Sequence, residues 1–330
     1  MNSSISNSNV RAWCCIALFM LTILGSMEVF SRLYTFHISK QSTWVDFPKR
    51  AQKLARASGA KVVIVGNSTT QFGVDSGRFE QALKNCGVEP VKAEKFAIGG
   101  THINKWHYIL KRFIWEPGCK PDLIVIPFMR HDLADSVDAP VSMLAQLVSG
   151  PKDWREVFKI DLQTSSEKAE FITASYWCTF AARDRIKGSL LAAAVPGYKR
   201  YAEQINAVNS RPKSLATPFQ PVARTYQALA RLQRYAHQFE TKILFVAYPV
   251  RSSAQDTPYS LNPALLSAID AGGMELLDLR NVTELTPDKY EDTVHLNDAG
   301  NKIWSRVLAE QVASHTMLKR QKVAANRIEQ

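Results

Sequence analysis

The chain has few cysteines, and none of them has the spacing of a metal site. Five occur among 330 residues, and no Cys-x-x-Cys pair is present, so a zinc centre of the usual structural kind is excluded. Cys14 and Cys15 lie in an apolar N-terminal stretch. The remaining three are too few for a disulfide framework, although a single Cys86–Cys119 or Cys119–Cys178 bridge stays open in an oxidising compartment.

Acidic residues are also scarce: 30 Asp and Glu stand against 41 Lys and Arg, which gives a formal net charge of +11. A basic chain favours anionic partners such as lipid headgroups or acidic glycans. Aromatic and basic side chains do not alternate along a stripe, so we expect no nucleic-acid partner. Most of the charge is spread along the chain, as on a solvated surface, and its densest piece is the tail Lys319–Lys322.

Phosphate loops and metal-ligand clusters are missing as well. Gly99 and Gly100 lack the further spaced glycines of a nucleotide-binding loop. His102 and His107 follow them, but no carboxylate or thiol at suitable spacing completes a set of metal ligands. We therefore expect neither a metal nor a cofactor.

A long apolar run lies near the N-terminus. Ala12–Met27 carries no charge, Arg11 precedes it, and Glu28 and Arg32 follow it. The run is slightly shorter than the roughly 20 residues of a perpendicular membrane span, but arginine side chains can extend to the two interfaces and lengthen it. We interpret it as an uncleaved single-pass anchor. A cleaved signal peptide, for which Gly25–Met27 is a poor cleavage site, and a buried helix are the alternatives.

Five short runs of β-branched and apolar residues predict a parallel sheet, because continuous runs of this kind suit strands buried on both faces. The runs are Lys61–Gly66, Ala93–Ile98, Asp122–Pro127, Lys242–Ala247 and Met274–Leu279. Helical patterns lie between them, at Phe79–Cys86, at Tyr226–Phe239 and in a final helix capped by Asn297 or Asp298. Strands that alternate with helices predict an α/β fold with helices on both faces of the sheet.

Ser68 follows the first predicted strand, in the stretch Gly66-Asn67-Ser68. Chemistry in an open parallel sheet gathers at the carboxyl ends of the strands. Gly66 lets the backbone turn tightly there, and Ser68 can also cap a following turn. Taken alone, a Gly-x-Ser after a strand is more often a turn than a nucleophile.

Asp292 and His295 form an Asp-x-x-His motif just before the final predicted helix. Side chains at this spacing can meet across one loop turn, so that the carboxylate accepts a hydrogen bond from one imidazole nitrogen and leaves the other as a base. A serine hydroxyl needs such a base, because it is a weak nucleophile by itself. Separately, Asp292 as a cap and His295 as an ordinary loop residue are the simpler interpretations, but together with Ser68 they predict a catalytic triad.

These blocks resemble the SGNH (GDSL-type) hydrolase superfamily over most of the chain from residue 61 to 312. Gly66-Asn67-Ser68 stands where the family has Gly-Asp-Ser, Gly100 matches the glycine of the second block, and Asp292 with His295 matches the last. The resemblance implies a three-layer sandwich with a central, flavodoxin-like parallel five-stranded sheet. It also implies Ser68 as nucleophile, His295 as base and Asp292 as its orienter, with the backbone N–H groups of Ser68 and Gly100 in the oxyanion hole.

One block departs from the family pattern. The third strand should lead to Gly-x-Asn-Asp, with the Asn as an oxyanion donor, but the chain reads Met129-Arg130-His131-Asp132. His131 can donate a hydrogen bond in place of the Asn, or Arg130 can stabilise the negative charge, so both are candidate oxyanion residues. The departure bears on general lipase or esterase activity more than on the triad.

The predicted organisation has four parts. Residues 1–38 form a cytoplasmic tip and the membrane anchor, 39–60 a juxtamembrane stalk, 61–315 the catalytic domain and 316–330 a basic tail. The stretch of about 133–221 interrupts the alternation of strands and helices. It exceeds any ordinary loop, so we expect an insertion with helices of its own, at 169–182 and 190–205.

Anchored chains with an altered third block and a large insertion are similar to proteins that O-acylate bacterial cell-surface polysaccharides, often beside a multi-spanning membrane acyltransferase. This resemblance implies acyl transfer or ester hydrolysis through an acyl-Ser68 intermediate, outside the cytoplasmic membrane. The substrates would be an acylated donor and a polysaccharide or ester. A carbohydrate or lipid esterase is the alternative. A non-catalytic envelope-binding protein with the same fold is a rival that the altered third block favours and the intact triad residues oppose.

Overall fold

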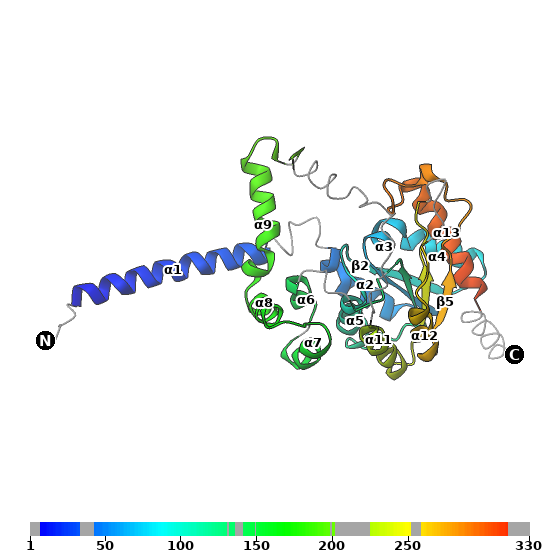
Figure 1. Ribbon diagram of the computed structural model, residues 1–330, viewed down its shortest axis with the longest axis horizontal. Coiled ribbons are helices and arrows are strands. Elements are labelled where there is room, and N and C mark those ends of the chain that lie inside the picture. The colour runs from blue at the N-terminus through cyan, green and yellow to red at the C-terminus, as the bar shows by residue number, and fades with distance from the viewer. Residues whose placement is uncertain are drawn as a thin grey trace. The chain divides into compact units, whose positions relative to one another are not determined.

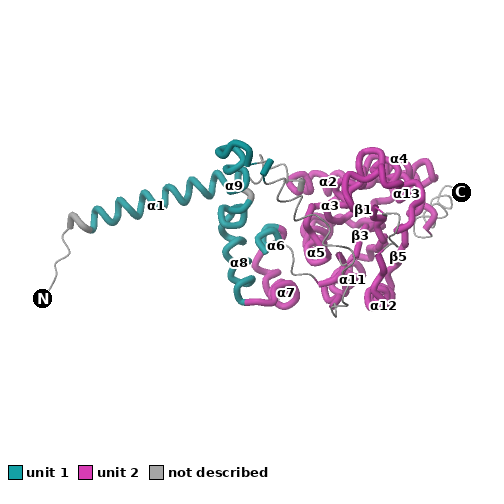
Figure 2. Tube along the Cα trace, turned by 45° about the horizontal axis from the view of Figure 1, so that its top comes forward, with its two compact units in different colours: residues 1–42, 141–146, 165–222 teal, residues 43–140, 147–164, 223–330 magenta. Residues whose placement is uncertain are grey.

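The chain forms two compact units in the computed structural model, which describes residues 7–33, 43–130, 132–135, 141–148, 150–198, 200–201, 225–251 and 259–315. The sheet unit comprises residues 43–140, 147–164 and 223–330 (Figure 2). The helical unit comprises residues 1–42, 141–146 and 165–222.

Five parallel strands form the centre of the sheet unit, in the order β2-β1-β3-β4-β5 (Figure 1). They are β1 Ala60–Gly66, β2 Val91–Ala97, β3 Leu123–Phe128, β4 Lys242–Ala247 and β5 Glu275–Asp278. Each of the five predicted strands is therefore confirmed. The order reverses at β1, as in flavodoxin-like sheets, and in such sheets ligands bind at the carboxyl ends of the strands beside the reversal. Here these are the ends of β1 and β3.

Helices cover both faces of the sheet. α4 (Ser76–Asn85) and α13 (Asp298–Ser314) bury Phe79, Trp304 and their neighbours in one core with alternate side chains of β1, β3 and β4. Outside that core, α2 contacts β2, α5 contacts β1, and α11 contacts β4. These three helices are α2 Phe47–Arg56, α5 Ile103–Leu110 and α11 Gln227–Gln238. The predicted three-layer sandwich with its central parallel sheet is confirmed.

The remaining described elements of the sheet unit are short. They are α3 Ser68–Gly73, a π-helical turn Lys111–Trp115 after α5, α7 Trp154–Ile160, α12 Pro263–Ala271 and the 3₁₀ turns Thr43–Asp46, Pro151–Asp153 and Pro287–Lys289. α6 (Val141–Leu147) crosses the boundary between the two units. The predicted cap of the final helix is present, since the Asn297 side chain accepts a hydrogen bond from the N–H of Gly300 at 3.0 Å.

Residues 43–56 fold onto the sheet and correct the predicted stalk of residues 39–60. Phe47 is fully buried and its ring meets Phe96 of β2 edge-on, with the ring centroids 5.0 Å apart. Leu54 is fully buried as well and lies on the same face of α2. The apolar periodicity of this helix therefore outweighs its polar composition, because one amphipathic face is enough to hold it on the core.

Residues near the two ends of the long segment between β3 and β4 are hydrogen-bonded to each other. The N–H of Asp135 donates to the carbonyl of Thr225 at 3.0 Å, and the Asp135 carboxylate accepts from the Thr225 hydroxyl at 2.6 Å. The same carboxylate accepts from the N–H groups of Gln227 and Ala228, both at 2.9 Å. Asp135 thus caps α11 from a distance and closes the base of the insertion.

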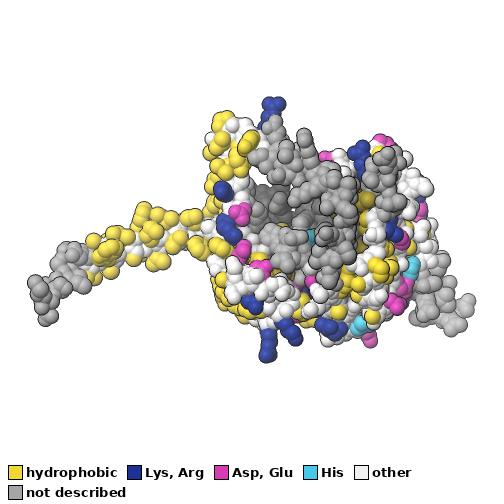
Figure 3. Space-filling model, viewed as in Figure 1, with side chains coloured by type: hydrophobic (Ala, Val, Ile, Leu, Met, Phe, Trp, Pro, Cys, Tyr) yellow, Lys and Arg dark blue, Asp and Glu magenta, His cyan; other side chains and the backbone are white. Residues whose placement is uncertain are grey.

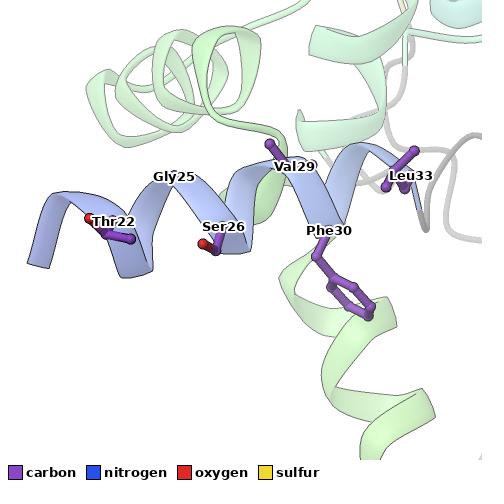
Figure 4. A pocket seen from close by; sticks show the side chains of 6 residues that line it. All are labelled: Thr22, Gly25, Ser26, Val29, Phe30 and Leu33. Atoms are coloured by element: carbon purple, nitrogen blue, oxygen red, sulfur yellow. The ribbon is translucent and has the colours of Figure 1, made fainter. Parts of the chain in front are cut away.

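The helical unit contains α1 (Asn7–Leu33), α8 (Ser165–Tyr176) and α9 (Cys178–Ala194). The insertion contains helices, but their bounds differ from the predicted ones. The break at Trp177 falls inside the first predicted helix of residues 169–182, and α9 ends at Ala194, inside the second predicted helix of residues 190–205. Residues 199 and 202–205 of that second helix lie outside the described residues. Within the described residues, α1 is the one helix long and apolar enough to cross a membrane, and Figure 3 shows its apolar surface. A groove along its second half is lined by Thr22, Gly25, Ser26, Val29, Phe30 and Leu33 (Figure 4).

Replacing Phe47 with Ala tests whether α2 belongs to the core. Removal of a buried aromatic ring should lower the free energy of unfolding by about 3–5 kcal/mol. Gln52→Ala, at an exposed position of the same helix, is the matched control and should change it by less than about 0.5 kcal/mol. Urea denaturation measures both, and equal midpoints for the two variants would show that α2 does not stabilise the sheet unit.

Candidate active site

The nucleophile candidate Ser68 is the first residue of α3, directly after β1 and Asn67. The Asn67 side chain caps α3, because its oxygen accepts from the N–H and the hydroxyl of Thr69 at 3.0 and 2.7 Å. A Cβ on Gly66 would lie 2.1 Å from the Thr70 hydroxyl, so only glycine allows this abrupt passage from strand to helix. The turn leaves Ser68 partly exposed at the carboxyl end of β1.

A tight loop before α13 presents Asp292 and His295. Tyr290 and Leu296 form an antiparallel bridge across it, and the N–H of Glu291 donates to the carbonyl of His295 at 2.8 Å. One carboxylate oxygen of Asp292 accepts from the N–H of His295 at 2.7 Å, and the other lies 2.7 Å from His295 Nδ1. The backbone of the loop and the imidazole are therefore held by the same carboxylate.

The structure brings the three predicted triad side chains together. His295 Nε2 lies 2.9 Å from Ser68 Oγ, across 227 positions of sequence. The ring of Phe72, on the exposed side of α3, meets the imidazole edge-on with the ring centroids 5.9 Å apart. With Nδ1 donating to Asp292, Nε2 is unprotonated in the neutral imidazole and can accept the hydroxyl proton of Ser68. Sequence reasoning missed Phe72, since an exposed aromatic four residues after Ser68 gives no signal until His295 is placed.

The pKa of the Asp292 carboxyl is lowered from its ordinary value. Partial burial acts in the opposite direction, but it is outweighed by the hydrogen bond with His295 and by the N–H groups of His295 and Val294. The group is therefore ionised at neutral pH. An ionised carboxylate fixes the tautomer of the imidazole and stabilises the imidazolium that forms when Nε2 takes a proton.

The predicted oxyanion glycine lies in the loop that follows β2. Gly100 has φ +70°, a backbone conformation that favours glycine. The loop is tied to α3, because the N–H of Gly99 donates to the Gln71 side-chain oxygen at 2.9 Å. Lys95 in turn donates to the carbonyls of Gln71 and Val74 at the end of α3, and burial lowers the pKa of Lys95 to about 8. Sequence reasoning found neither Gln71 nor Lys95.

Asp132 connects the loops that follow β1, β2 and β3. It is almost fully buried, and one of its oxygens accepts from Asn67 Nδ2 at 2.9 Å and from the N–H of Met129 at 3.0 Å. The other oxygen lies 3.1 Å from Nδ1 of His102, at the start of α5. An Asn in place of the usual Asp before Ser68 makes this contact possible, because an amide can donate to a carboxylate that a second carboxylate would repel. Asp132 is the final residue of the altered third block, and its place in that block is the only feature of the sequence that points to a role for it.

The two tentative oxyanion residues are not brought together with Ser68 by any described contact. Arg130 is exposed and has φ 50°, so its backbone is in the left-handed region. His131 lies outside the described residues. Strained backbone in a non-glycine residue is common at functional sites, and here it lies two residues after β3, at the carboxyl end of the strand.

The chain is similar to solved esterases and acylhydrolases. An acetyl xylan esterase shares 16% identity over 77% of this chain and 98% of its own, with a TM-score of 0.37. A lipase/acylhydrolase from Enterococcus faecalis shares 12% over 77% and 95%, with a TM-score of 0.37. A variant of an acetyl xylan esterase from Geobacillus stearothermophilus shares 14% over 77% and 95%, with a TM-score of 0.35. No protein-family model matches the chain, and no curated protein matches it.

The resemblance to the SGNH superfamily agrees with the architecture of this chain. The strand order is the flavodoxin-like one that the resemblance implies. The first and last blocks meet through the hydrogen bond of Ser68 with His295. The second block supplies a left-handed glycine beside α3.

The structure gives no disulfide to the five cysteines, all of which lie in the described part of the chain and are free thiols. Neither the Cys86–Cys119 nor the Cys119–Cys178 bridge is formed. Cys119 is buried, and burial raises the pKa of its thiol, so the thiol is a poor nucleophile. Among the described residues, no group of three or more His, Cys, Asp or Glu side chains is arranged to hold a metal ion.

The depressed pKa of Asp292 predicts a pH-dependent contribution to stability. Because the folded pKa is below the unfolded one, ionised Asp292 stabilises the folded state above the unfolded pKa, and this contribution is lost as pH falls through the folded value. Wild type should therefore be more stable than Asp292→Asn at pH 7, and the difference should shrink below about pH 4. Urea denaturation of both proteins across this range measures it, and a pH-independent difference would contradict the ionic role.

Proposed function

We propose that the chain is a membrane-anchored serine esterase or O-acyltransferase that works through an acyl-Ser68 intermediate. The observation that carries this proposal is the 2.9 Å hydrogen bond between His295 Nε2 and Ser68 Oγ, with Asp292 2.7 Å from the other ring nitrogen. A nucleophile in contact with a base, and the base in contact with an orienting carboxylate, is the arrangement that activates a hydroxyl.

The first half of the reaction acylates the serine. Ser68 Oγ attacks the acyl carbonyl of an ester donor, and its proton passes to His295 Nε2. The tetrahedral intermediate then collapses, the bond to the donor oxygen breaks, and the alcohol leaves with the proton from His295. Asp292 stays ionised throughout and stabilises the imidazolium.

The second half transfers the acyl group to an acceptor. His295 Nε2 takes the proton of a water molecule or a sugar hydroxyl, whose oxygen attacks the acyl carbon. The bond to Ser68 Oγ breaks, and the serine recovers its proton from His295. Water gives ester hydrolysis and a sugar hydroxyl gives acyl transfer, so the two activities share every protein group up to the choice of acceptor.

The negative oxygen of each tetrahedral intermediate needs hydrogen-bond donors. We assign the backbone N–H groups of Ser68 and Gly100 to this role, which is supported by the left-handed glycine and by the tie of its loop to α3 through Gln71. A donor of this kind contributes about 3 kcal/mol to the transition state. Arg130 and His131 are the candidates for the position that an Asn holds in the family.

An extracytoplasmic polysaccharide or cell-envelope polymer is the acceptor that we favour. The carboxylate of Asp292 is half exposed and His295 is partly exposed, so the triad is open to a large acceptor. The net charge of +11 suits an anionic polymer. A multi-spanning membrane acyltransferase would supply the acylated donor, and the anchor α1 would hold the sheet unit on the extracytoplasmic side of the cytoplasmic membrane.

Labelling with a fluorophosphonate probe tests the nucleophile. The probe should modify Ser68 in the wild-type chain, and Ser68→Ala should lose both the label and the hydrolysis of a short-chain ester, by a factor on the order of 10³ or more. Ser58→Ala changes an exposed serine before β1 and should retain both. Undiminished activity of the Ser68→Ala variant would remove the acyl-serine mechanism.

Acyl transfer is separated from hydrolysis by the fate of the acyl group. With an isotopically labelled acetyl ester and an anionic polysaccharide, the label should appear on the polymer in an amount that depends on Ser68 and His295. Mass spectrometry of the polymer and of the released acetate measures both products. Release of free acetate alone, unchanged by the polysaccharide, would leave the chain an esterase.

A further inference from the structure

Exposed apolar side chains are concentrated in the helical unit. Outside α1, the described large apolar side chains that are exposed are two in the sheet unit, Phe72 and Leu266, and six in the helical unit. The six are Ile172, Tyr176, Trp177, Leu190, Val195 and Tyr201. Phe72 packs on His295, and Trp177 stacks on Phe180. Exposed apolar side chains outside α1 are therefore most frequent on α8, on α9 and on the residues just after α9.

A carboxylate of α1 fastens the first turn of α9. Glu28 of α1 accepts from the N–H of Cys178 and from the N–H of Thr179, both at 3.0 Å, and from the Thr179 hydroxyl at 3.1 Å. Arg32, one turn further along α1, donates to the same carboxylate at 2.8 Å. No side chain next to α9 caps it. Glu28 therefore supplies the cap of α9 and fixes its first turn to the end of α1.

This attachment sets the position of α9 along α1. Glu28 is five residues before the end of α1 at Leu33, a rise of about 7.5 Å. A span that begins near Val10 rises about 27 Å before it reaches Glu28, close to the roughly 30 Å thickness of bilayer hydrocarbon. The first turn of α9 is therefore held where a membrane helix enters the headgroup layer.

α9 also has the direction of an interfacial helix. Figures 1 and 2 both show α9 running across the axis of α1 and not alongside it. A helix that crosses a membrane-spanning helix in this way lies along the membrane plane. Its fixed end is in the headgroup layer, so its whole length stays near that layer.

The second half of α9 and the following turn have the composition that this location requires. Residues 188–198 read GSLLAAAVPGY and carry no charge, and most of them are exposed. Lys187 precedes this stretch, and Lys199 and Arg200 follow it. Eleven residues are too few to span a bilayer, but an apolar surface flanked by basic and aromatic side chains binds the boundary between acyl chains and anionic headgroups.

We propose that α9 and the turn after it dock on the lipid bilayer that α1 spans, with Leu190 and Val195 in contact with acyl chains. The inference rests on the membrane anchor of the proposed function. Lipid is the occupant because Glu28 fastens the helix that carries the apolar stretch to the anchor itself and because cations border the stretch on both sides. The docked insertion gives the protein a second membrane contact besides α1.

Photocrosslinking from position 190 tests the docking. The full chain, with p-benzoylphenylalanine in place of Leu190, is reconstituted in vesicles of phosphatidylethanolamine and phosphatidylglycerol, irradiated and digested for mass spectrometry. Lipid adducts should form at position 190 several-fold more often than at position 266, an exposed leucine of the sheet unit that carries the same photoprobe as the matched control. Adducts at equal yield at the two positions would overturn the proposal.

Glu28→Ala tests the fastening, with Glu28→Gln as the conservative variant. Loss of the cap should reduce the lipid adducts at position 190 several-fold, while the Gln variant, which keeps an acceptor oxygen, should fall between the two. Unchanged adducts in Glu28→Ala would show that Glu28 does not hold α9 at the membrane. An unchanged melting temperature of the sheet unit checks that the variants fold.

An alkaline wash distinguishes failure of the docking from failure of the anchor. A chain that stays in the vesicles but gives no lipid adduct at position 190 would overturn the docking and leave the anchor in place. Crosslinks from position 190 to a second copy of the chain would replace lipid with a protein interface. Release of the chain by the wash would overturn both proposals together.

Discussion

The candidate active site depends on one hydrogen bond that joins residues 227 positions apart, from His295 Nε2 to Ser68 Oγ. Local structure alone cannot bring two residues so far apart in sequence together. The parallel sheet does so, because the carboxyl ends of all its strands lie at one edge, which includes the reversal of strand order at β1. β1 delivers Ser68 to this edge, and α13, packed against α4 in the same core, brings the loop with His295 to it. A change that shifted α13 along the sheet would separate the pair even with both residues intact.

Asp132 holds the loops at the carboxyl edge of the sheet in fixed positions relative to one another. A buried carboxylate is costly unless it is hydrogen-bonded, and this one is bonded by an amide from the nucleophile turn, by a backbone N–H after β3 and by His102 at the start of α5. The loops after three different strands therefore share one acceptor. The Asn at position 67, which looks like a defect when the first block is compared with Gly-Asp-Ser, is the donor that this shared acceptor needs.

Much of this could be predicted from the sequence. Strands buried on both faces can be recognised in the sequence as runs of β-branched and apolar residues. The strand Lys242–Ala247 has in the structure the same bounds as the predicted run. Ser68, Asp292 and His295 were found because each belongs to a short motif. Phe47, Gln71, Lys95 and Asp132 were missed or left without a role, because their partners lie tens of residues away and a single sequence contains no signal for such pairs. Residues 43–56 are not part of a stalk, as their polar and basic composition suggested, because the apolar periodicity within them packs α2 on the core.

Glu28 bears on whether α1 is an anchor that is part of the fold, as we propose, or a leader that is removed from it. A carboxylate near the end of an apolar helix is expensive unless donors reach it, and the first turn of any helix has N–H groups without partners. In this chain the two are paired, because Glu28 accepts from the first two N–H groups of α9 and from the Thr179 hydroxyl. A leader has no reason to cap a helix 150 positions further along the chain, and cleavage after Ser26 would leave that cap on a loose two-residue end. The contact supports the proposed anchor α1, and it couples the insertion to that helix through a carboxylate that Arg32 also holds.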